Sequence, residues 1–538
     1  NTLCIPTAFM SYTGEVLDKK TPLLRSMDAL NVQALRILKL FGRADVKRVV
    51  TTVGPEQEYF LIDKSMYDRR PDLIYTGRTL YGARPPKGQE LEDHYFGALK
   101  KRVGDFMRDL DETLWKLGVL AKTEHNEVSP AQHELAPIFN NTNIGTDHNQ
   151  LTMEMMKKVA SEHGMVCLLH EKPFAGVNGS GKHNNWSIAT DTGANLLEPG
   201  ASPSENAQFL LFLAAVIKAI DEHQDLLRIS AASAGNDHRL GASEAPPAII
   251  SMFLGEELTG IVEALVAKAA YNPKAKDEMD IGVAVLPHFF KDTTDRNRTS
   301  PFAFTGNKFE FRMVGSAFSI ADPNTILNTT VAESLRLFAD ELEKAEDFNT
   351  TLNKLIRHTI RDHKRIIFNG NNYADSWVVE AEKRGLLNWK SSAEAIPHLS
   401  DAKNVALFKQ HNIFTEAEVH SRQDILLENY VKVVSIEALT MLDMVSRDII
   451  PAILGFSGNL AKTAGAKAAL DISVDAEKAL CGKLSKLDSD ILAKGEALDA
   501  AVKALPEEGA AEAASYTRKE IFSAMGALRA AVDEAEPL

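Results

Sequence analysis

The chain has few cysteines: only Cys4, Cys167 and Cys481 occur among its 538 residues. They are widely spaced and match no metal-binding or redox motif, which argues against a disulfide framework and is typical of a reducing compartment. The chain also has no run of about 18 apolar residues and no signal-like start, so we expect neither a membrane span nor a secretion signal. These absences are typical of a soluble cytoplasmic protein.

Basic residues are in deficit: 60 lysines and arginines stand against 74 aspartates and glutamates, for a net charge of −14. This acidic balance argues against a general nucleic-acid-binding surface. A Walker phosphate loop is absent too, because the glycine-rich stretch at residues 178–181 is not followed by Lys-Ser or Lys-Thr at the required spacing. An anionic substrate would therefore have to be attracted by local charge.

What the chain does contain is a set of strands with one polar face. A glycine-rich turn in residues 177–187 runs into a predicted strand, and side chains two apart in a strand share a face. One face carries His183, Asn185 and Ser187, and the other carries Asn184, Trp186 and Ile188. The turn leaves backbone N–H groups free to bind an anion. A buried polar row of this kind predicts a binding site.

The same period of two recurs in two other segments. In residues 53–63, Glu56 and Glu58 fall on one face at the start of an apolar strand, and such close carboxylates repel each other unless a cation lies between them. In residues 308–312 the two phenylalanines are predicted to be core. The opposite face carries Lys308, Glu310 and Arg312.

A fourth segment holds Glu127 and Glu134 on either side of Pro130. Proline disfavours both a continuous helix and a central strand, so we expect a bent loop that turns both carboxylates inward. With His183 the four segments supply several carboxylates and one imidazole, a set that suits Mg²⁺ or Mn²⁺ better than zinc and is large enough for two ions. Taken singly, a Glu-x-Glu pair is more often a solvated strand face, and a lone histidine is more often a hydrogen-bonded core residue.

In combination and in this order, the segments resemble glutamine synthetase over most of residues 47–320. The paired-glutamate strand, the second acidic segment and the glycine-histidine signature match residues 54–58, 126–134 and 178–183. Further on, the family's mobile glutamate flap, arginine segment and last metal strand resemble residues 239–246, 297–298 and 309–312. The long tail resembles the type III branch, the large bacterial form.

The resemblance implies ligation of ammonia to the γ-carboxylate of L-glutamate at the expense of ATP, through γ-glutamyl phosphate. It implies one metal held by Glu58, Glu127 and Glu134, and a second held by Glu56, His183 and Glu310. Catalytic roles fall to Glu244 and Arg298, and substrate binding to Asn178, Gly179, Arg239 and Arg312. The nucleotide pocket would be lined by Phe139, Ser187 and Lys308.

Two departures from the family pattern are visible. The second arginine of the arginine segment is replaced by Ala303, which affects the ATP clamp. The family's N-terminal β-domain, which lends an aspartate to the neighbouring subunit's active site, has no evident counterpart, and residue 1 is Asn rather than Met. We therefore expect that an upstream segment is missing and that this chain alone is catalytically incomplete.

The expected fold is α+β: a curved antiparallel sheet backed by helices, with a helical C-terminal extension. We divide the chain into a lead-in segment (1–46), a catalytic domain (47–365) and the extension (366–538). Apolar periodicity predicts helices at 89–118, 147–170, 205–230 and 324–346. In the extension it predicts a helix at 426–453 that glycines at 455–458 break, and two helices within 473–536.

Three functions stay open. The first is a glutamine synthetase that assembles into homo-oligomeric rings, with a dodecamer suspected from the family. The second is a related γ-glutamyl ligase that uses another amine, or a guanidino kinase. The third is a non-catalytic ring-forming relative, against which the compatible set of ionisable groups argues. No tyrosine loop for adenylylation is recognisable.

Overall fold

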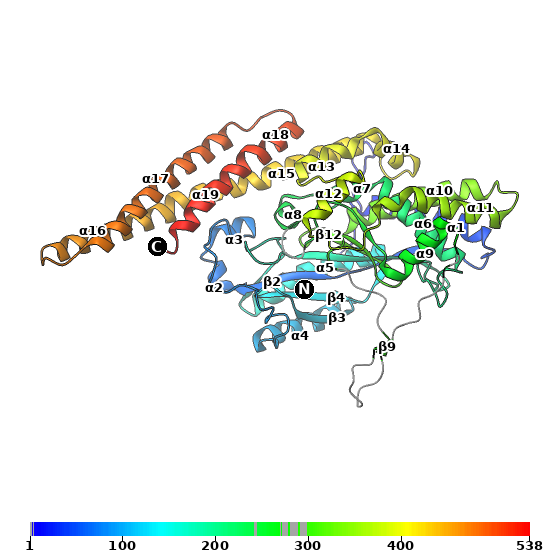
Figure 1. Cartoon of the computed structure of the whole chain (residues 1–538), viewed down its shortest axis with the longest axis horizontal. Coiled ribbons are helices and arrows are strands. Elements are labelled where there is room, and N and C mark those ends of the chain that lie inside the picture. Colours follow the sequence, from blue (N-terminus) through cyan, green and yellow to red (C-terminus); the bar gives the residue numbers. More distant parts are fainter. Residues whose placement is uncertain are drawn as a thin grey trace.

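The structure, a computed structural model, describes residues 3, 5–241, 245–269, 271, 278–279, 289–290 and 298–538. Two sheets with their covering helices form a broad body, and the last helices project from one end of it (Figure 1). In the described part of the chain, no helix combines the length and apolarity that a membrane crossing requires.

The larger sheet has six strands and carries the predicted polar faces. Its order is β5 (Asn140–Asn141), β1 (Val49–Pro55), β7 (Gly181–Thr190), β12 (Phe309–Gly315), β11 (Phe302–Phe304) and β8 (Met252–Phe253). All neighbours are antiparallel except β11 and β8. Trp186 and Ile188 of β7 are fully buried in the main core, as the alternation predicted.

The smaller sheet has four antiparallel strands, and its core is separate. Its order is β3 (Ala121–Asn126), β4 (Gln132–Pro137), β2 (Gln57–Asp63) and β6 (Met165–Leu168). Helices α4 (Lys101–Lys116) and α5 (Thr142–Glu162) contribute to this core. A third, two-stranded pair joins β9 (Glu278–Met279) and β10 (Phe289–Phe290).

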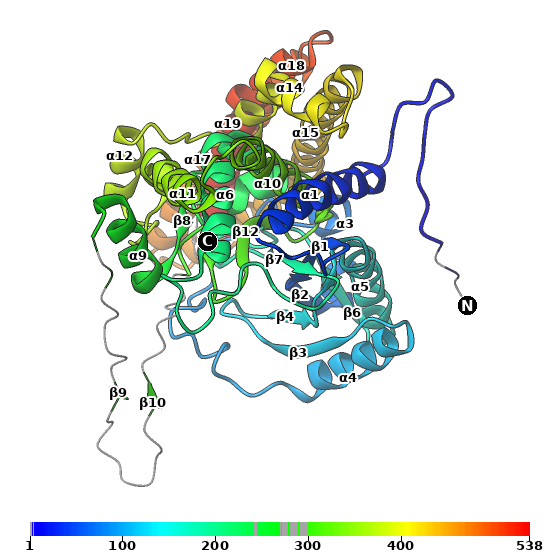
Figure 2. The ribbon, with the colours of Figure 1, turned by 90° about the vertical axis from the view of Figure 1, so that its right-hand side faces the viewer.

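Helices cover the larger sheet on the side away from the smaller one. Figure 2 shows α1 (Lys20–Leu40), α6 (Ala207–Glu222) and α10 (Ala321–Leu342) on that side, with the smaller sheet and α4 on the other. The remaining helices of the body are α2 (Lys64–Tyr67), α3 (Pro71–Thr76), α7 (Gln224–Ile229), α8 (Ala234–Arg239), α9 (Gly255–Ala267), α11 (Phe348–His363), α12 (Asp375–Lys383), α13 (Ser392–Ala395) and α14 (Ala402–Gln410), with short 3-10 turns at Lys364–Ile366 and Ile396–Ser400. The mixed α and β architecture is therefore confirmed.

The extension predicted at 366–538 begins with α12 to α14, whose residues Trp377, Leu407 and Phe408 pack in the main core. Its later part is a bundle of long helices, whose apolar core also includes Leu80, Tyr81 and Ala234 of the body. The bundle consists of α15 (Glu416–Met444), a π-helical turn (Val445–Ile449), α16 (Ile450–Ala468), α17 (Asp475–Lys503), α18 (Ala510–Tyr516), a second π-helical turn (Thr517–Ile521) and α19 (Phe522–Ala535). The predicted break at glycines 455–458 is wrong, since α16 continues through them. A Cβ added at Gly455 or Gly458 would meet no atom within 4 Å, so the surroundings do not require glycine at either position. The helix is instead stabilised by its packing along α17.

Two other helix predictions are wrong at one end. The predicted helix at 89–118 begins only at Lys101, because Glu92 has a left-handed backbone (φ 51) and the preceding residues hydrogen-bond to other segments. The helix predicted at 147–170 ends at Glu162, because Gly164 (φ 65) reverses the chain into β6. The predicted helix at 205–230 is divided between α6 and α7, with His223 at the junction.

Candidate active site

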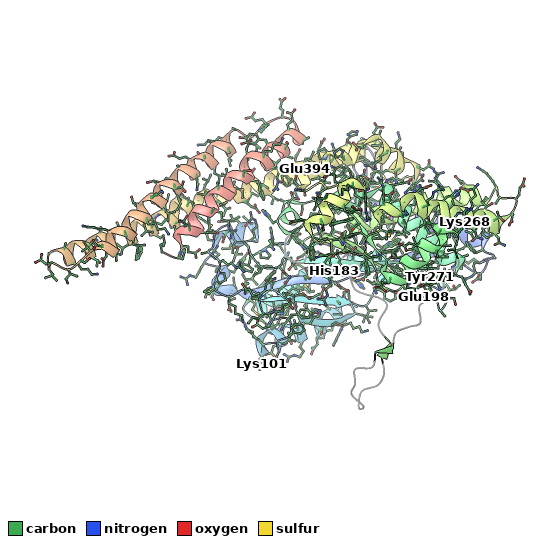
Figure 3. All side chains as sticks on the ribbon, viewed as in Figure 1. Lys101, His183, Glu198, Lys268, Tyr271 and Glu394 are labelled. Atoms are coloured by element: carbon green, nitrogen blue, oxygen red, sulfur yellow. The ribbon has the colours of Figure 1, made fainter. Side chains whose placement is uncertain are left out.

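The candidate site lies where the two sheets meet, and Glu56 marks the junction. The chain leaves the larger sheet at Pro55 and enters the smaller one at Gln57, so the single strand predicted over residues 53–63 is wrong. The backbone N–H of Glu56 donates to the carbonyl of His183 at 3.0 Å, which holds the junction against β7. His183 lies in the middle of the body (Figure 3).

One cluster of donor groups, which we call the imidazole cluster, consists of Glu56, His183 and Glu310. Nδ1 of His183 lies 3.1 Å from a Glu56 oxygen and 3.0 Å from a Glu310 oxygen, and one ligand atom from each residue falls within 4.8 Å of the others. Asn185, which faces Glu310 across the β7–β12 ladder, donates from Nδ2 to Glu56 at 3.1 Å. The cluster therefore unites three segments of the predicted set.

Charge pairing dominates the imidazole cluster. Burial favours the neutral imidazole, but the hydrogen bonding of its ring N–H to the carboxylates of Glu310 and Glu56 outweighs burial and raises the pKa of His183 well above its ordinary value. Burial likewise opposes ionisation of Glu310, yet His183 and the Arg312 charge lower the pKa of that carboxyl below its usual range. Without a metal the cluster thus binds a proton in the place of a cation.

The second cluster, which we call the acidic cluster, consists of His125, Glu127 and Glu134, whose ligand atoms also lie within 4.8 Å of one another. Nε2 of His125 is 2.9 Å from Glu134, and Nδ1 is 3.6 Å from Glu127. The hydrogen bond that His125 donates to Glu134 raises the pKa of His125 to about 9, and burial raises the pKa of Glu134. The loop around Pro130 turns Glu127 inward as expected, whereas Glu134 lies on β4.

His125 was not among the residues selected from the sequence, although it stands two residues before Glu127, the spacing that identified the other polar faces. Strand register explains its position: Glu58 and His125 both pair with Glu134, from opposite sides of β4. Glu58 therefore lies beside the acidic cluster, where its carboxylate accepts from the backbone N–H of Gly181 at 2.5 Å. Burial raises the pKa of Glu58 to about 7.

The donor chemistry of these residues fits divalent cations. Both clusters offer carboxylate oxygens with one imidazole, and burial raises the pKa of Glu58 to about 7 and the pKa of Glu134 above its usual range. Oxygen-rich sets of this type suit Mg²⁺ and Mn²⁺. The raised pKa values are the observation that supports a cation here, since a nearby positive charge would favour the ionised forms.

The arginines expected at the site differ in their environments. Nε and Nη2 of Arg312 form a fork on the two oxygens of Glu310, at 3.0 and 3.1 Å. The guanidinium of Arg298 lies 5.9 Å from the ring centre of Tyr95. Ala303, at the position of the missing second arginine, is fully buried in β11 opposite Glu310.

Arg239 is 2% exposed, and its guanidinium donates to backbone carbonyls of β12, with Nη2 3.0 Å from the oxygen of residue 312. In this structure it braces β12, so its expected contact with a substrate carboxylate stays a prediction. Its position also explains one glycine of the signature. A Cβ at Gly181 would lie 2.1 Å from Nη2 of Arg239, so a side chain there would displace the guanidinium.

Residues expected to line the nucleotide pocket lie along the same end of the larger sheet. The hydroxyl of Ser187 donates to the carbonyl of residue 307 at 2.8 Å, which places it beside Lys308. Phe139, whose side chain is exposed, packs against Gly54 on β1. Glu244, expected on the flap, and residue 297 lie outside the described residues.

Three parts of the chain match family descriptions. Residues 35–250 match "Glutamine synthetase, catalytic domain", and residues 351–468 match "Glutamine synthetase C-terminal domain". Residues 1–26 match "Glutamine synthetase type III N terminal", so the lead-in segment has a counterpart in the family. The body with its two donor clusters thus contains a glutamine synthetase catalytic domain.

Curated proteins show the same relationship along the whole chain. A glutamine synthetase of Butyrivibrio fibrisolvens is 50% identical over 549 residues, which cover 100% of this chain and 77% of that protein. A type-3 glutamine synthetase of Dictyostelium discoideum is 51% identical (86% of this chain, 63% of that protein), and a glutamine synthetase of Bacteroides fragilis is 46% identical (85% and 64%). The chain belongs to the glutamine synthetase family.

Proposed function

We propose that this chain joins ammonia to the γ-carboxylate of L-glutamate with ATP, giving glutamine, ADP and phosphate through γ-glutamyl phosphate. The observation that carries the proposal is the meeting of the imidazole and acidic clusters at the junction of two sheets, within a glutamine synthetase catalytic domain. Phosphoryl transfer requires positioning and charge neutralisation more than covalent help, and this arrangement supplies both.

Divalent metal ions are required in this family, and we propose Mg²⁺ or Mn²⁺. The imidazole cluster would hold one ion. Glu127 and Glu134 would hold another, with Glu58 as predicted or His125 as the geometry suggests. When bound, the ions would neutralise the phosphate oxygens and lower the charge repulsion between ATP and glutamate.

The chain's own side chains would bind and orient the substrates. Arg298 would stabilise the transferring phosphoryl group, and Arg312 and Arg239 would bind glutamate carboxylates, for which a guanidinium fork is suited. Glu244 would close the flap, exclude water from the acyl phosphate and take a proton. The remaining contacts would come from Asn178 and Gly179 to glutamate, and from Phe139, Ser187 and Lys308 to the nucleotide.

Metal binding at the imidazole cluster is expected to release about one proton at pH 7, in addition to any proton released at the acidic cluster, where the pKa of His125 is about 9. The raised pKa of His183 keeps its imidazole charged between Glu56 and Glu310, and a cation can bind Nδ1 only after that proton leaves. Affinity should therefore increase as the pH rises. Calorimetric titration with Mn²⁺ in two buffers of different ionisation enthalpy measures the released protons.

The His183→Asn variant is the control for this titration, since it cannot carry the proton. It should bind Mn²⁺ more weakly and release fewer protons than the wild type. Equal proton release by both proteins would contradict the assignment of the proton to His183.

The proposed activity is tested by phosphate release from Mg·ATP. Release that depends on both glutamate and ammonium supports a glutamine synthetase. Release that depends on glutamate and on another amine, with ammonium ineffective, would instead indicate the related γ-glutamyl ligase. The same assay on a longer chain that carries an upstream segment measures whether residues before Asn1 contribute to the reaction.

We propose that the protein acts in the cytoplasm as a homo-oligomeric ring, with a dodecamer as the first candidate. The support is the N-terminal arm, residues 5–12, which exposes Ile5, Phe9 and Tyr12 before the chain rejoins the body at Val16, whose backbone N–H donates to Glu418 (Figure 2). Apolar side chains exposed together on an arm are typical of subunit contacts. Sedimentation analysis of the wild type measures the assembly directly.

A further inference from the structure

Residues 88–100 cross the candidate site as turns, and we call them the strap. Gln89 forms two hydrogen bonds with Asn178: the backbone N–H of Asn178 donates to Oε1 of Gln89 at 2.7 Å, and Nε2 of Gln89 donates to Oδ1 of Asn178 at 2.7 Å. Farther along, Nδ1 of His94 donates to the carbonyl of Glu127 at 2.7 Å. The strap thus contacts both the glycine-rich signature and the acidic cluster.

The two bonds of Gln89 determine which end of the Asn178 amide remains for a ligand. A backbone N–H can only donate, so it must face the oxygen of Gln89. The other end of the Gln89 amide is then its NH₂ group, which can only donate and must face the oxygen of Asn178. Nδ2 of Asn178 is the remaining end, and it donates no hydrogen bond to any described residue.

A donor of this kind suits an oxygen and not an ammonium group. We propose that Gln89 is a positioning residue for specificity: it holds the Asn178 amide so that Nδ2 binds the α-carboxylate of the amino-acid substrate. The inference rests on the proposed function and changes one expectation, because the family resemblance placed Asn178 near the α-amino group. Asn178 is 3% exposed, so its amide has little freedom once Gln89 holds it.

The strap is itself anchored by the C-terminal extension. Residues 78–83, which lead into it, contact α15 through Arg78 and Tyr81, which bond to Glu437 and the carbonyl of Met441, and contact α19 through the carbonyl of Thr79, which accepts from Arg529. The backbone N–H of Gly82 donates to Asp533 at 2.8 Å, and that of Ala83 donates to Glu536 at 2.5 Å. The residues that lead to Gln89 are therefore fixed in place. Its two hydrogen bonds can then orient the Asn178 amide without a large loss of conformational entropy.

The test compares Gln89→Glu with Gln89→Ala. In Gln89→Glu, one oxygen still accepts from the Asn178 N–H, but the other faces Oδ1, so repulsion turns the amide and presents its oxygen to the substrate. We expect this variant to raise the KM for glutamate by about 10- to 100-fold, the loss typical of a hydrogen bond to a charged group. Gln89→Ala leaves the Asn178 amide free to adopt either orientation, so it should raise the KM for glutamate by only about 2- to 10-fold.

Which of the two variants has the higher KM for glutamate shows whether Gln89 positions Asn178 or only supports the strap. If Gln89 only holds the strap, the shape-conserving Gln89→Glu should be the milder change. The KM for ATP and Mn²⁺ affinity should stay within about twofold in both variants, and Arg84→Ala, an exposed neighbour paired with Glu90, should match the wild type. Calorimetric titration with L-glutamate gives the same comparison without turnover.

The outcomes are distinct. If Gln89→Glu binds glutamate more weakly than Gln89→Ala does, the inference is supported. If Gln89→Glu binds glutamate as well as Gln89→Ala or better, while the wild type uses glutamate, only the inference is overturned. A wild type that neither binds nor uses glutamate overturns the proposed function and this inference with it.

Discussion

Replacing Glu310 with glutamine is expected to lower glutamine formation by more than about 100-fold, above the range typical of residues that only support a metal ligand. Glu310 is 8% exposed and lies 3.0 Å from His183 and 3.0 Å from Nε of Arg312. Glutamine keeps the shape but removes the charge that both partners require. The imidazole cluster would lose a metal ligand, and the guanidinium fork of Arg312 would lose the charge of the Glu310 carboxylate.

The measurement is phosphate release together with Mn²⁺ titration, with folding followed by circular dichroism. The matched control is Glu380→Gln on α12, which also removes a carboxylate paired with an arginine, Arg384 at 2.9 Å, but at an exposed position. The control should keep activity within about twofold. Retention of more than about a tenth of the activity by Glu310→Gln, with unchanged Mn²⁺ affinity, would contradict the assignment.

Replacing Glu437 with alanine is expected to destabilise the joint between the body and the extension by about 3–5 kcal/mol. Nε and Nη2 of Arg78 each lie 2.7 Å from a Glu437 oxygen, and the two side chains are 10% and 1% exposed. Alanine would leave the guanidinium buried without a partner. The loss should appear as a lower urea midpoint and as faster proteolysis of the extension.

Two variants test the cause. Glu428→Ala on the same helix removes an exposed carboxylate paired with Lys432 and should cost less than about 1 kcal/mol. The double variant Arg78→Met/Glu437→Leu should recover most of the stability, since it leaves no buried charge. Equal destabilisation by Glu428→Ala would show that α15, and not the buried pair, is responsible.

The same pair predicts a pH dependence. Burial opposes ionisation of Glu437, but the charge and hydrogen bonds of Arg78 lower its pKa below the usual range. A group whose pKa is lowered on folding stabilises the fold above its unfolded pKa and loses that contribution as the pH falls toward the folded value. The difference in stability between the wild type and Glu437→Ala should therefore shrink in acid.

The alternation of side chains predicted the parts of the site that depend on one strand at a time. Trp186 and Ile188 are buried while His183 and Asn185 face the site, because neighbouring residues of a strand always point to opposite sides. The phenylalanines beside Glu310 are buried for the same reason. No tertiary information was needed for these assignments.

The strap shows where local patterns fail. Apolar residues at helical spacing predicted a helix from residue 89, yet side chains of Gln89 and His94 gain hydrogen bonds to segments far away in the chain. Those contacts, and the left-handed backbone of Glu92, outweigh a local preference that is worth only a fraction of a kcal/mol per residue. The glycines at 455 and 458 show the reverse case, in which packing along α17 maintains a helix that composition disfavours.

The sequence by itself determined the family, the α and β architecture and most of the ionisable residues that meet at the junction, because strand period and segment order are local properties. Only the tertiary structure decided that Glu56 lies at the junction of two sheets while Glu58 lies in the smaller one, that His125 joins Glu127 and Glu134, and that Gln89 holds Asn178. These relations depend on strand register and on contacts between residues far apart in the chain, and packing of the whole domain selects them.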